Sequence, residues 1–269
     1  MEKRVTVSIS EGVADVRLVR ADKMNALDAA MFDALVAASE RLACEKGLRA
    51  VVLSGEGRAF CAGLDMGRFA AMKKGGNGIE GGEKRDLAER THGLANFPQQ
   101  AVWGWRQLPV PVIAAIQGVA FGGGFQLALG ADLRFLSPDA RMSIMEIKWG
   151  LVPDMAGTPI LASLVRDDIL RELTYTGRIF SAQEALGYGL ATRICDDPRA
   201  AALEVAREIA GKSPEAIRAA KRMLNKLSVD PGPALLAESV EQMKLMGSAN
   251  QLEAVRANLE KRAPRFADA

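Results

Sequence analysis

The chain has 269 residues, with 35 basic and 33 acidic side chains and a formal net charge of +2. This charge favours neither a nucleic-acid footprint nor a membrane-surface role, and no apolar run approaches the roughly 18 residues of a membrane span. The composition is 49% hydrophobic but only 5% aromatic, which predicts an ample aliphatic core. The length fits one large domain or a main domain with a helical appendage.

Reactive side chains are scarce. Three widely spaced cysteines, Cys44, Cys61 and Cys195, favour a reducing compartment without structural disulfides. Because the start also lacks an apolar signal segment, we expect a cytoplasmic protein. His92 is the single histidine and lies in a polar segment, so it is expected at the surface and no metal site is predicted. Acid–base chemistry should therefore fall to carboxylates.

Strand and helix patterns alternate in the first half of the chain. They predict, in order, a hairpin (5–9 and 13–19), a polar loop (20–27), a helix to about residue 45, a buried strand (50–55) and a helix through 101–105. This order favours right-handed crossovers in a largely parallel sheet. Residues 72–92 are glycine-rich and charged, which predicts a flexible insertion, with a mobile lid as the functional alternative.

The most informative stretch is 111–130. An apolar, β-branched run predicts a buried strand, Gly122–Gly124 allow a tight turn, and a helix follows. Main-chain N–H groups at such a helix start suit an enolate oxygen or a phosphate, although the glycines could serve close packing alone. Spacing excludes two nucleotide motifs, because Leu127 and Ala206 stand where each would need a glycine.

Two carboxylates lie beyond this stretch. Glu146 follows Ile144 and Met145, and Asp154 comes eight residues after it. Burial among such neighbours should raise the pKa of Glu146, whereas a position at the protein edge would leave that pKa near normal. The sequence does not choose between these alternatives.

The remainder reads as one more strand and then helices. The patterns are a strand over 132–136, a helical region after Pro159, a capping box at Ser181 and Glu184, a helix start at Ser213-Pro214, and amphipathic helices over about 232–245 and 249–262. The last two helices cannot bury themselves alone, so they should pack on the main domain or on neighbouring subunits.

Several segments together resemble the crotonase superfamily, the enoyl-CoA hydratase/isomerase family, over nearly the whole chain. They are Lys23–Leu27, Ala59–Asp65, Gly118–Gly124, Asp132–Arg134, Gly150–Pro153, Ser181–Ala185, Gly189-Leu190 and Glu260–Arg262. The resemblance implies an α/β, crotonase-like fold of repeated ββα units over 1–200 and a C-terminal helical trimerisation region over 201–269. It also implies a homotrimer or a dimer of trimers that binds an acyl-CoA thioester and needs no other cofactor, metal, nucleic acid or membrane.

The same resemblance assigns roles to individual residues. The N–H groups of Leu64 and Gly123 would form an oxyanion hole for the thioester oxygen. Coenzyme A would be bound at Lys23, Met24 and Ala62, and its phosphates at Lys261 of the same or a neighbouring subunit. The apolar tail would contact segments 64–72 and 94–108, through Leu64, Met66, Phe69 and Trp103.

The chain departs from the hydratase pattern at one position. Hydratases of this family carry two water-activating glutamates, but here the first is Gln126 and the second is Glu146. Glutamine cannot take a proton from water. Asp154 matches dienoyl-CoA isomerases, although those enzymes also have an aspartate at position 126. Double-bond isomerisation by Glu146 and Asp154 is therefore slightly favoured over hydration with a Gln126-held water, and a non-catalytic acyl-CoA binder is the third alternative.

Overall fold

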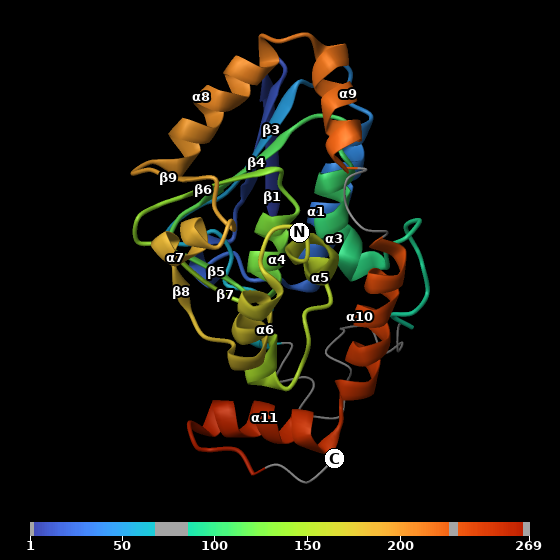
Figure 1. Ribbon diagram of the computed structural model, residues 1–269, viewed down its shortest axis with the longest axis vertical. Helices are drawn as coiled ribbons and strands as arrows, with labels where there is room; N and C mark the ends of the chain where they lie inside the picture. The colour runs from blue at the N-terminus through green and yellow to red at the C-terminus, as the bar shows by residue number, and fades with distance from the viewer. Residues whose placement is uncertain (1–2, 68–85, 226–230, 266–269) are drawn as a thin grey trace.

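The computed structural model describes residues 3–67, 86–225 and 231–265. Most of the predicted flexible insertion over 72–92 lies outside these residues. In the described part, a six-stranded sheet forms the centre of the molecule (Figure 1). Its strands, in spatial order, are β1 (Val5–Ser10), β2 (Val13–Leu18), β3 (Ala50–Gly55), β4 (Val112–Ile116), β6 (Leu133–Leu136) and β9 (Arg193–Ile194).

The pairing confirms the predicted hairpin and the parallel sheet. β1 and β2 are antiparallel, with Val5 opposite Leu18, and every later neighbour in this sheet is parallel. The carboxyl ends of β2, β3 and β4 therefore meet at one edge of the sheet, which is where ligands of open α/β sheets bind.

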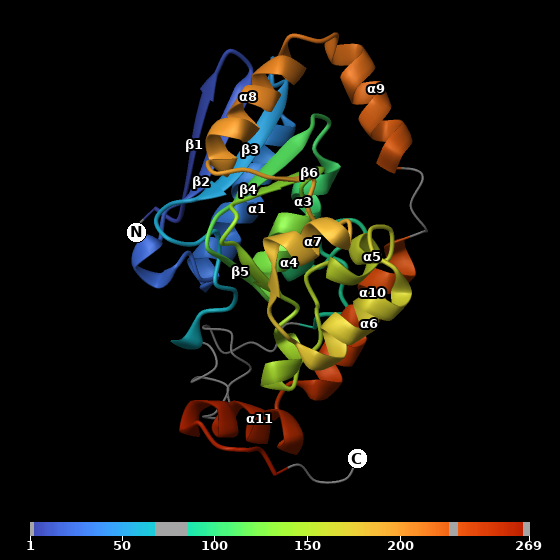
Figure 2. The same cartoon turned by 60° about the vertical axis from the view of Figure 1, so that its left-hand side comes forward.

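The two faces of the sheet are covered by different helices. Successive residues of a strand point to opposite faces, so Leu53 packs in the larger core with α1 (Ala29–Ala43) and α3 (Phe97–Gln107). Val52 instead packs in a smaller cluster against Ala202 and Ala206 of α8 (Pro198–Ala210). Figure 2 shows α8 on one side of the sheet and α1 and α3 beyond it.

The chain between β4 and the following helix differs from the expected single strand and turn. The strand ends at Ile116, and residues Val119–Phe121 form β5 of a separate sheet with β7 (Arg141–Ser143) and β8 (Phe180–Ser181). Gly118 makes this break, since it has φ +62° and a Cβ there would lie 2.0 Å from the Arg58 carbonyl oxygen. No other residue type fits that approach.

The remaining helices complete the fold. They are η1 (Ala21–Lys23), α4 (Gly123–Leu129), η2 (Glu146–Trp149), α5 (Gly157–Leu161), α6 (Asp167–Thr176), α7 (Ala182–Gly187), α9 (Pro214–Asn225), α10 (Pro231–Leu245) and α11 (Ala249–Glu260). The capping box at Ser181 and Glu184 is confirmed. The prediction that only helices follow Pro159 is wrong, because β8 and β9 also lie there; two-residue strands carry no periodic signal.

The last two helices pack against elements from the middle of the chain. α10 packs against α5, and α11 lies across η2 at the end of the molecule opposite α8 and α9 (Figures 1 and 2). Within the described ranges, no helix combines the length and the apolar character needed to cross a membrane.

Gly124→Ala should lower the free energy of unfolding by about 1–3 kcal/mol, the usual cost of overpacking. A Cβ at Gly124 would lie 2.3 Å from the Cys61 carbonyl oxygen, so α4 would have to move. Gly187→Ala in α7 is the matched control, because its Cβ would meet nothing within 4 Å. Urea unfolding of both variants measures the difference, and equal stabilities would show that this contact is not tight.

Candidate active site

An isolated parallel bridge joins the loop after β3 to strand β5, which is distant in sequence. The Cys61 N–H donates to the Val119 carbonyl oxygen at 3.1 Å, and the Phe121 N–H donates to the Cys61 carbonyl oxygen at 3.1 Å. The Cys61 thiol is buried, which raises its pKa to about 12, so this residue is a packing element rather than a nucleophile. The bridge holds segment 61–64 beside the start of α4.

The Leu64 and Gly123 main chains meet at this bridge. Leu27 bonds to both neighbours of Leu64: its N–H donates to the Gly63 carbonyl at 2.8 Å, and its carbonyl accepts from the Asp65 N–H at 3.1 Å. The Leu64 N–H therefore points away from Leu27. Gly123 is the first residue of α4, so its N–H has no partner within the helix. A Cβ built on Gly63 would lie only 3.8 Å from the Gly123 nitrogen.

Both segments line one large cavity of about 1030 Å³. Seven of the residues predicted for the site line it, namely Lys23, Met24, Ala62, Leu64, Gly123, Glu146 and Asp154. Its apolar wall includes Met66, Phe97, Trp149 and Met155. The volume exceeds that of ordinary small-ligand pockets, which suits a long ligand with a polar and an apolar end.

Other predicted residues lie elsewhere. Trp103 is buried in the core and is not among the residues that line the cavity, and Phe69 lies outside the described residues. Lys261 is an exposed residue at the end of α11, and Gln126 lies behind the cavity wall with 1% of its surface exposed. His92 is half-buried beside Phe97, outside this lining.

Glu146 begins η2 and has 9% of its surface exposed. Burial raises the pKa of its carboxyl to about 7; its own N–H and the Gln126 amide lower it, and the charges of Asp154 and Glu238 raise it. Of the two positions that the sequence left open for Glu146, the structure has the buried one. A pKa near neutrality allows the same carboxyl group to take up and return a proton at physiological pH.

Gln126 bonds to two parts of the site. Its Nε2 donates to Glu146 Oε1 at 2.6 Å, while its Oε1 accepts from the N–H groups of Met155 at 2.9 Å and Gly157 at 3.0 Å. The reverse amide orientation would place NH₂ against two N–H donors, so the network fixes the one described. Gln126 therefore presents a donor, and no acceptor, towards Glu146.

Glu238 of α10 is a site residue that sequence reasoning missed. Its carboxylate accepts from the N–H groups of Ala156 at 3.0 Å and Thr158 at 2.8 Å, and from the Thr158 hydroxyl. Burial raises the pKa of this carboxyl to about 7, although these donors lower it. The signal was the helical spacing of Glu238 with Leu235, Ser239 and Gln242, which places it on the buried face.

The segment that follows Asp154 is consequently held from both sides. Its four successive N–H groups, from Met155 to Thr158, bond alternately to Gln126 and to Glu238. Gln242 of α10 adds a bond from the Val152 N–H at 3.2 Å. α10 thus helps to fix the loop that carries Asp154 to the cavity.

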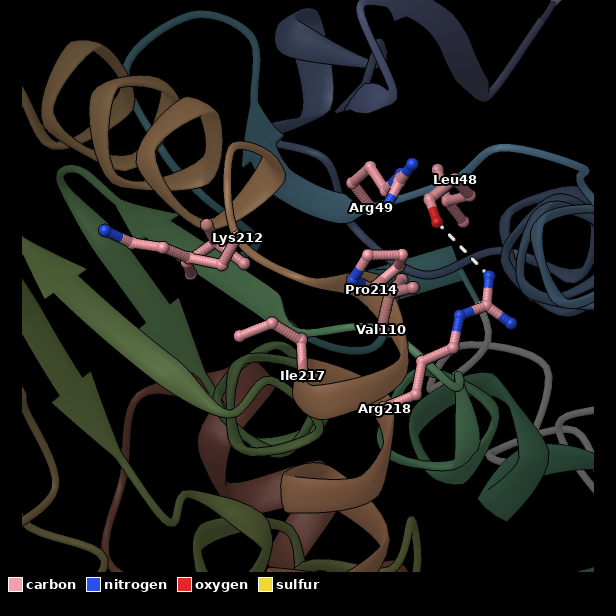
Figure 3. Close-up of a pocket in the computed structure, with 8 residues that line it drawn as sticks. Leu48, Arg49, Val110, Lys212, Pro214, Ile217 and Arg218 are labelled. Atoms are coloured by element: carbon pink, nitrogen blue, oxygen red, sulfur yellow. Dashed lines mark hydrogen bonds between the residues drawn. The ribbon is translucent and has the colours of Figure 1, made fainter.

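A second depression lies at the opposite end of the sheet (Figure 3). Leu48 and Val110 precede the amino ends of β3 and β4, and Arg218 of α9 donates to the Leu48 carbonyl at 3.3 Å. It has no volume that a water molecule could occupy, so it is a packed junction. Among the described residues, no group of three or more His, Cys, Asp or Glu is placed to hold a metal ion.

A sequence profile for enoyl-CoA hydratase/isomerase matches residues 8–269. The chain belongs to the enoyl-CoA hydratase/isomerase family. It is 34% identical over 252 residues to carnitinyl-CoA dehydratase of Proteus mirabilis, covering 91% of each chain. It is 31% identical over 262 residues to mouse mitochondrial Delta(3,5)-Delta(2,4)-dienoyl-CoA isomerase, covering 95% of this chain and 79% of that protein.

Solved structures of the family agree with the fold. An enoyl-CoA hydratase/isomerase of Pseudoalteromonas atlantica matches with a TM-score of 0.84 and 29% identity, covering 98% of this chain and all of the other. The crotonase-like fold and the family resemblance are therefore confirmed, and the protein is an enzyme of the hydratase/isomerase family. Because the named relatives catalyse different reactions, the choice between hydration and isomerisation must come from the site itself.

The raised pKa of Glu146 predicts a pH-dependent difference in stability. In the unfolded chain this carboxyl loses its proton near pH 4.5, but in the folded protein only near pH 7, so its contribution to stability falls as pH rises between these values. Glu146→Gln removes that contribution. The free energy of unfolding of Glu146→Gln, measured relative to the parent by urea at several pH values, should therefore rise from pH 4.5 to 7.

Glu238→Gln should behave in the same way, because its pKa is raised to about 7 from the same ordinary value. Carboxyls with lowered pKa values, such as Asp15 and Asp65, act at more acidic pH and are shared by all three proteins. A difference that stayed constant across this window would mean that Glu146 is not held protonated by burial.

Proposed function

We propose that this enzyme moves a double bond along an unsaturated acyl-CoA, with Glu146 as the main proton carrier and Asp154 as the second. The observation that supports it best is the direction of the Gln126 amide, which donates to Glu146 and bonds through its oxygen to Met155 and Gly157. Glu146 and Asp154 both line the cavity, and they are close enough for the charge of Asp154 to raise the pKa of Glu146.

The proposed reaction begins with the thioester oxygen between the N–H groups of Leu64 and Gly123. Glu146 takes a proton from the carbon next to the double bond, and the electron pair moves through the conjugated chain to give a dienolate. The two N–H groups stabilise the negative oxygen, and losing such a donor typically costs about 3–4 kcal/mol. A proton from Glu146 or Asp154 then adds to the far end of the conjugated system, so no atom is gained or lost.

Hydration of a 2-enoyl-CoA is the second candidate, favoured by the likeness to carnitinyl-CoA dehydratase. It needs an acceptor that takes a proton from the attacking water. Gln126 offers only N–H, because its oxygen already accepts two main-chain hydrogen bonds. Glu146 would have to activate the water alone, which makes hydration the weaker candidate.

The ligand-binding parts of the proposal follow the cavity. Lys23, Met24 and Ala62 lie together on its wall, and the Ala62 N–H donates to the Met24 carbonyl oxygen at 2.9 Å. They would hold the adenosine end of coenzyme A, with Lys261 reaching its phosphates from a neighbouring subunit. Region 201–269 would form the contacts between subunits in a trimer or a dimer of trimers. The enzyme would need no other cofactor and would act in the cytoplasm.

Glu146→Gln should lower kcat/KM by about 100- to 10,000-fold, the usual contribution of a general acid–base group, while coenzyme A binding is kept. The test measures turnover of 3,5-dienoyl-CoA and crotonyl-CoA by ultraviolet absorbance, and coenzyme A binding by calorimetry. Glu208→Gln, at an exposed glutamate near Lys212, is the control. Equal activity of Glu146→Gln and the parent would remove Glu146 from the mechanism.

Asp154→Asn should lower isomerisation of the dienoyl substrate at least about tenfold and leave crotonyl-CoA turnover, if any is found, nearly unchanged. The reason is that only the shift of a double bond needs a second acid further along the acyl chain. Asp33→Asn removes a carboxylate from α1 at another part of the cavity wall, and thus controls for a general change of charge. Selective loss of hydration in Asp154→Asn would reverse the order of the two candidates.

A further inference from the structure

The two oxygens of Glu146 have different surroundings. Oε1 accepts the 2.6 Å hydrogen bond from Gln126 Nε2, whereas Oε2 is buried and bonds to no partner among the described residues. Because the Gln126 oxygen is held by Met155 and Gly157, its NH₂ group cannot turn away from Glu146. This asymmetry belongs to the fold and exists before any substrate binds.

When Glu146 is protonated, its two oxygens also differ chemically. A protonated carboxyl has one carbonyl oxygen, which accepts hydrogen bonds well, and one hydroxyl oxygen, which donates. The Gln126 N–H needs an acceptor in a buried site, where an unmade hydrogen bond is costly. The carbonyl character is therefore drawn to Oε1, and the hydroxyl proton is left to Oε2.

We propose that Gln126 is a positioning residue that reserves Oε2 of Glu146 for the proton that the substrate gives up and takes back. The inference rests on the proposed role of Glu146 as the proton carrier, and it holds for either candidate reaction. Gln126 does not touch the substrate in this arrangement. Where an acid at position 126 could accept or donate, Gln126 only donates to Glu146. Oε1 of Glu146 is therefore always the acceptor, and Oε2 is always the reactive oxygen.

Charged groups around Glu146 also affect its titration. Asp154 and Glu238 raise its pKa, and Lys148 of the same turn lines the cavity. On the other helices packed against η2, charges pair at the surface, Glu172 of α6 with Arg178 and Glu253 of α11 with Arg262. None of these groups replaces the Gln126 hydrogen bond, so its removal is a specific perturbation.

The first variant is Gln126→Met, which fills a similar volume without the donor. Loss of a hydrogen bond to the charged form should raise the pKa of Glu146 by about one to two units. The ascending limb of the pH–kcat profile should move by the same amount, and kcat on its plateau should fall about 10- to 100-fold with little change in KM. Gln100→Met, at a buried glutamine of α3, is the matched control and should leave the limb in place.

The second variant is Gln126→Glu, which keeps an acceptor for the Met155 and Gly157 N–H groups and so guards against loss of folding. Two carboxyl oxygens would then face each other across the former 2.6 Å hydrogen bond and share one proton. The pair should titrate in two steps, with the upper step above the parent's pKa. A single step at the parent's pKa would overturn the proposal.

A readout without turnover separates this inference from the proposed reaction. The carboxyl band of Glu146 is obtained by infrared spectroscopy as the difference between each protein and its Glu146→Gln counterpart, followed from pH 5 to 10. An upward shift of its midpoint in Gln126→Met, with a matching shift of the kinetic limb, supports the proposal. An unchanged midpoint overturns it, whichever reaction the parent catalyses. A shifted midpoint with an unmoved kinetic limb overturns it as well, because Glu146 would then not carry the proton.

Discussion

The site depends on the bridge between Cys61 and Ala120. This contact joins the loop after β3 to strand β5, and it brings Gly63 close to the main chain of Gly123. Gly63 and Gly124 make it possible, since a Cβ at either position would lie within 2.5 Å of a carbonyl oxygen of the opposite loop. The proposed oxyanion hole would therefore be a product of backbone packing, to whose donors the side chain of Leu64 contributes nothing.

A second constraint sets the position of the acids. The segment 155–158 would leave four N–H groups unpaired beside the cavity, and the fold satisfies them with one amide from α4 and one carboxylate from α10. Unmade hydrogen bonds at buried N–H groups are costly, so both side chains are needed for stability. The same bonds fix the loop of Asp154, which ties the C-terminal region to the chemistry.

Much of the fold could be predicted because it follows from local patterns. The hairpin, the buried strand before β5 and the capping box at Ser181 depend on neighbours in sequence, and each is confirmed. The break at Gly118 was missed because its cause is the Arg58 carbonyl, sixty residues earlier. The strands β8 and β9 were missed because two residues cannot show a period.

For the site, as for the fold, features that depend on neighbours in sequence could be predicted, and features that depend on distant residues could not. Glu146 stood out because its apolar neighbours are adjacent in sequence, but its burial, which raises its pKa, is decided by the fold. Glu238 did not, because its partners Ala156 and Thr158 lie about eighty residues away. The direction of the Gln126 amide is also a tertiary property, decided by which main-chain groups the fold brings to its oxygen.

At position 126, an amide and a carboxylate of the same shape would act differently, because only the amide can donate a hydrogen bond to an ionised Glu146. A carboxylate there would accept from Met155 and Gly157 and would repel Glu146, so the pair would have to share a proton or bind a water between them. The amide accepts from the same two N–H groups but donates to Glu146 at 2.6 Å, which removes the need for water. In the proposed mechanism Glu146 then has one hydrogen-bonded oxygen and one reactive oxygen, with no second acid at position 126. Such a site is suited to carrying a proton between two carbons of one bound chain.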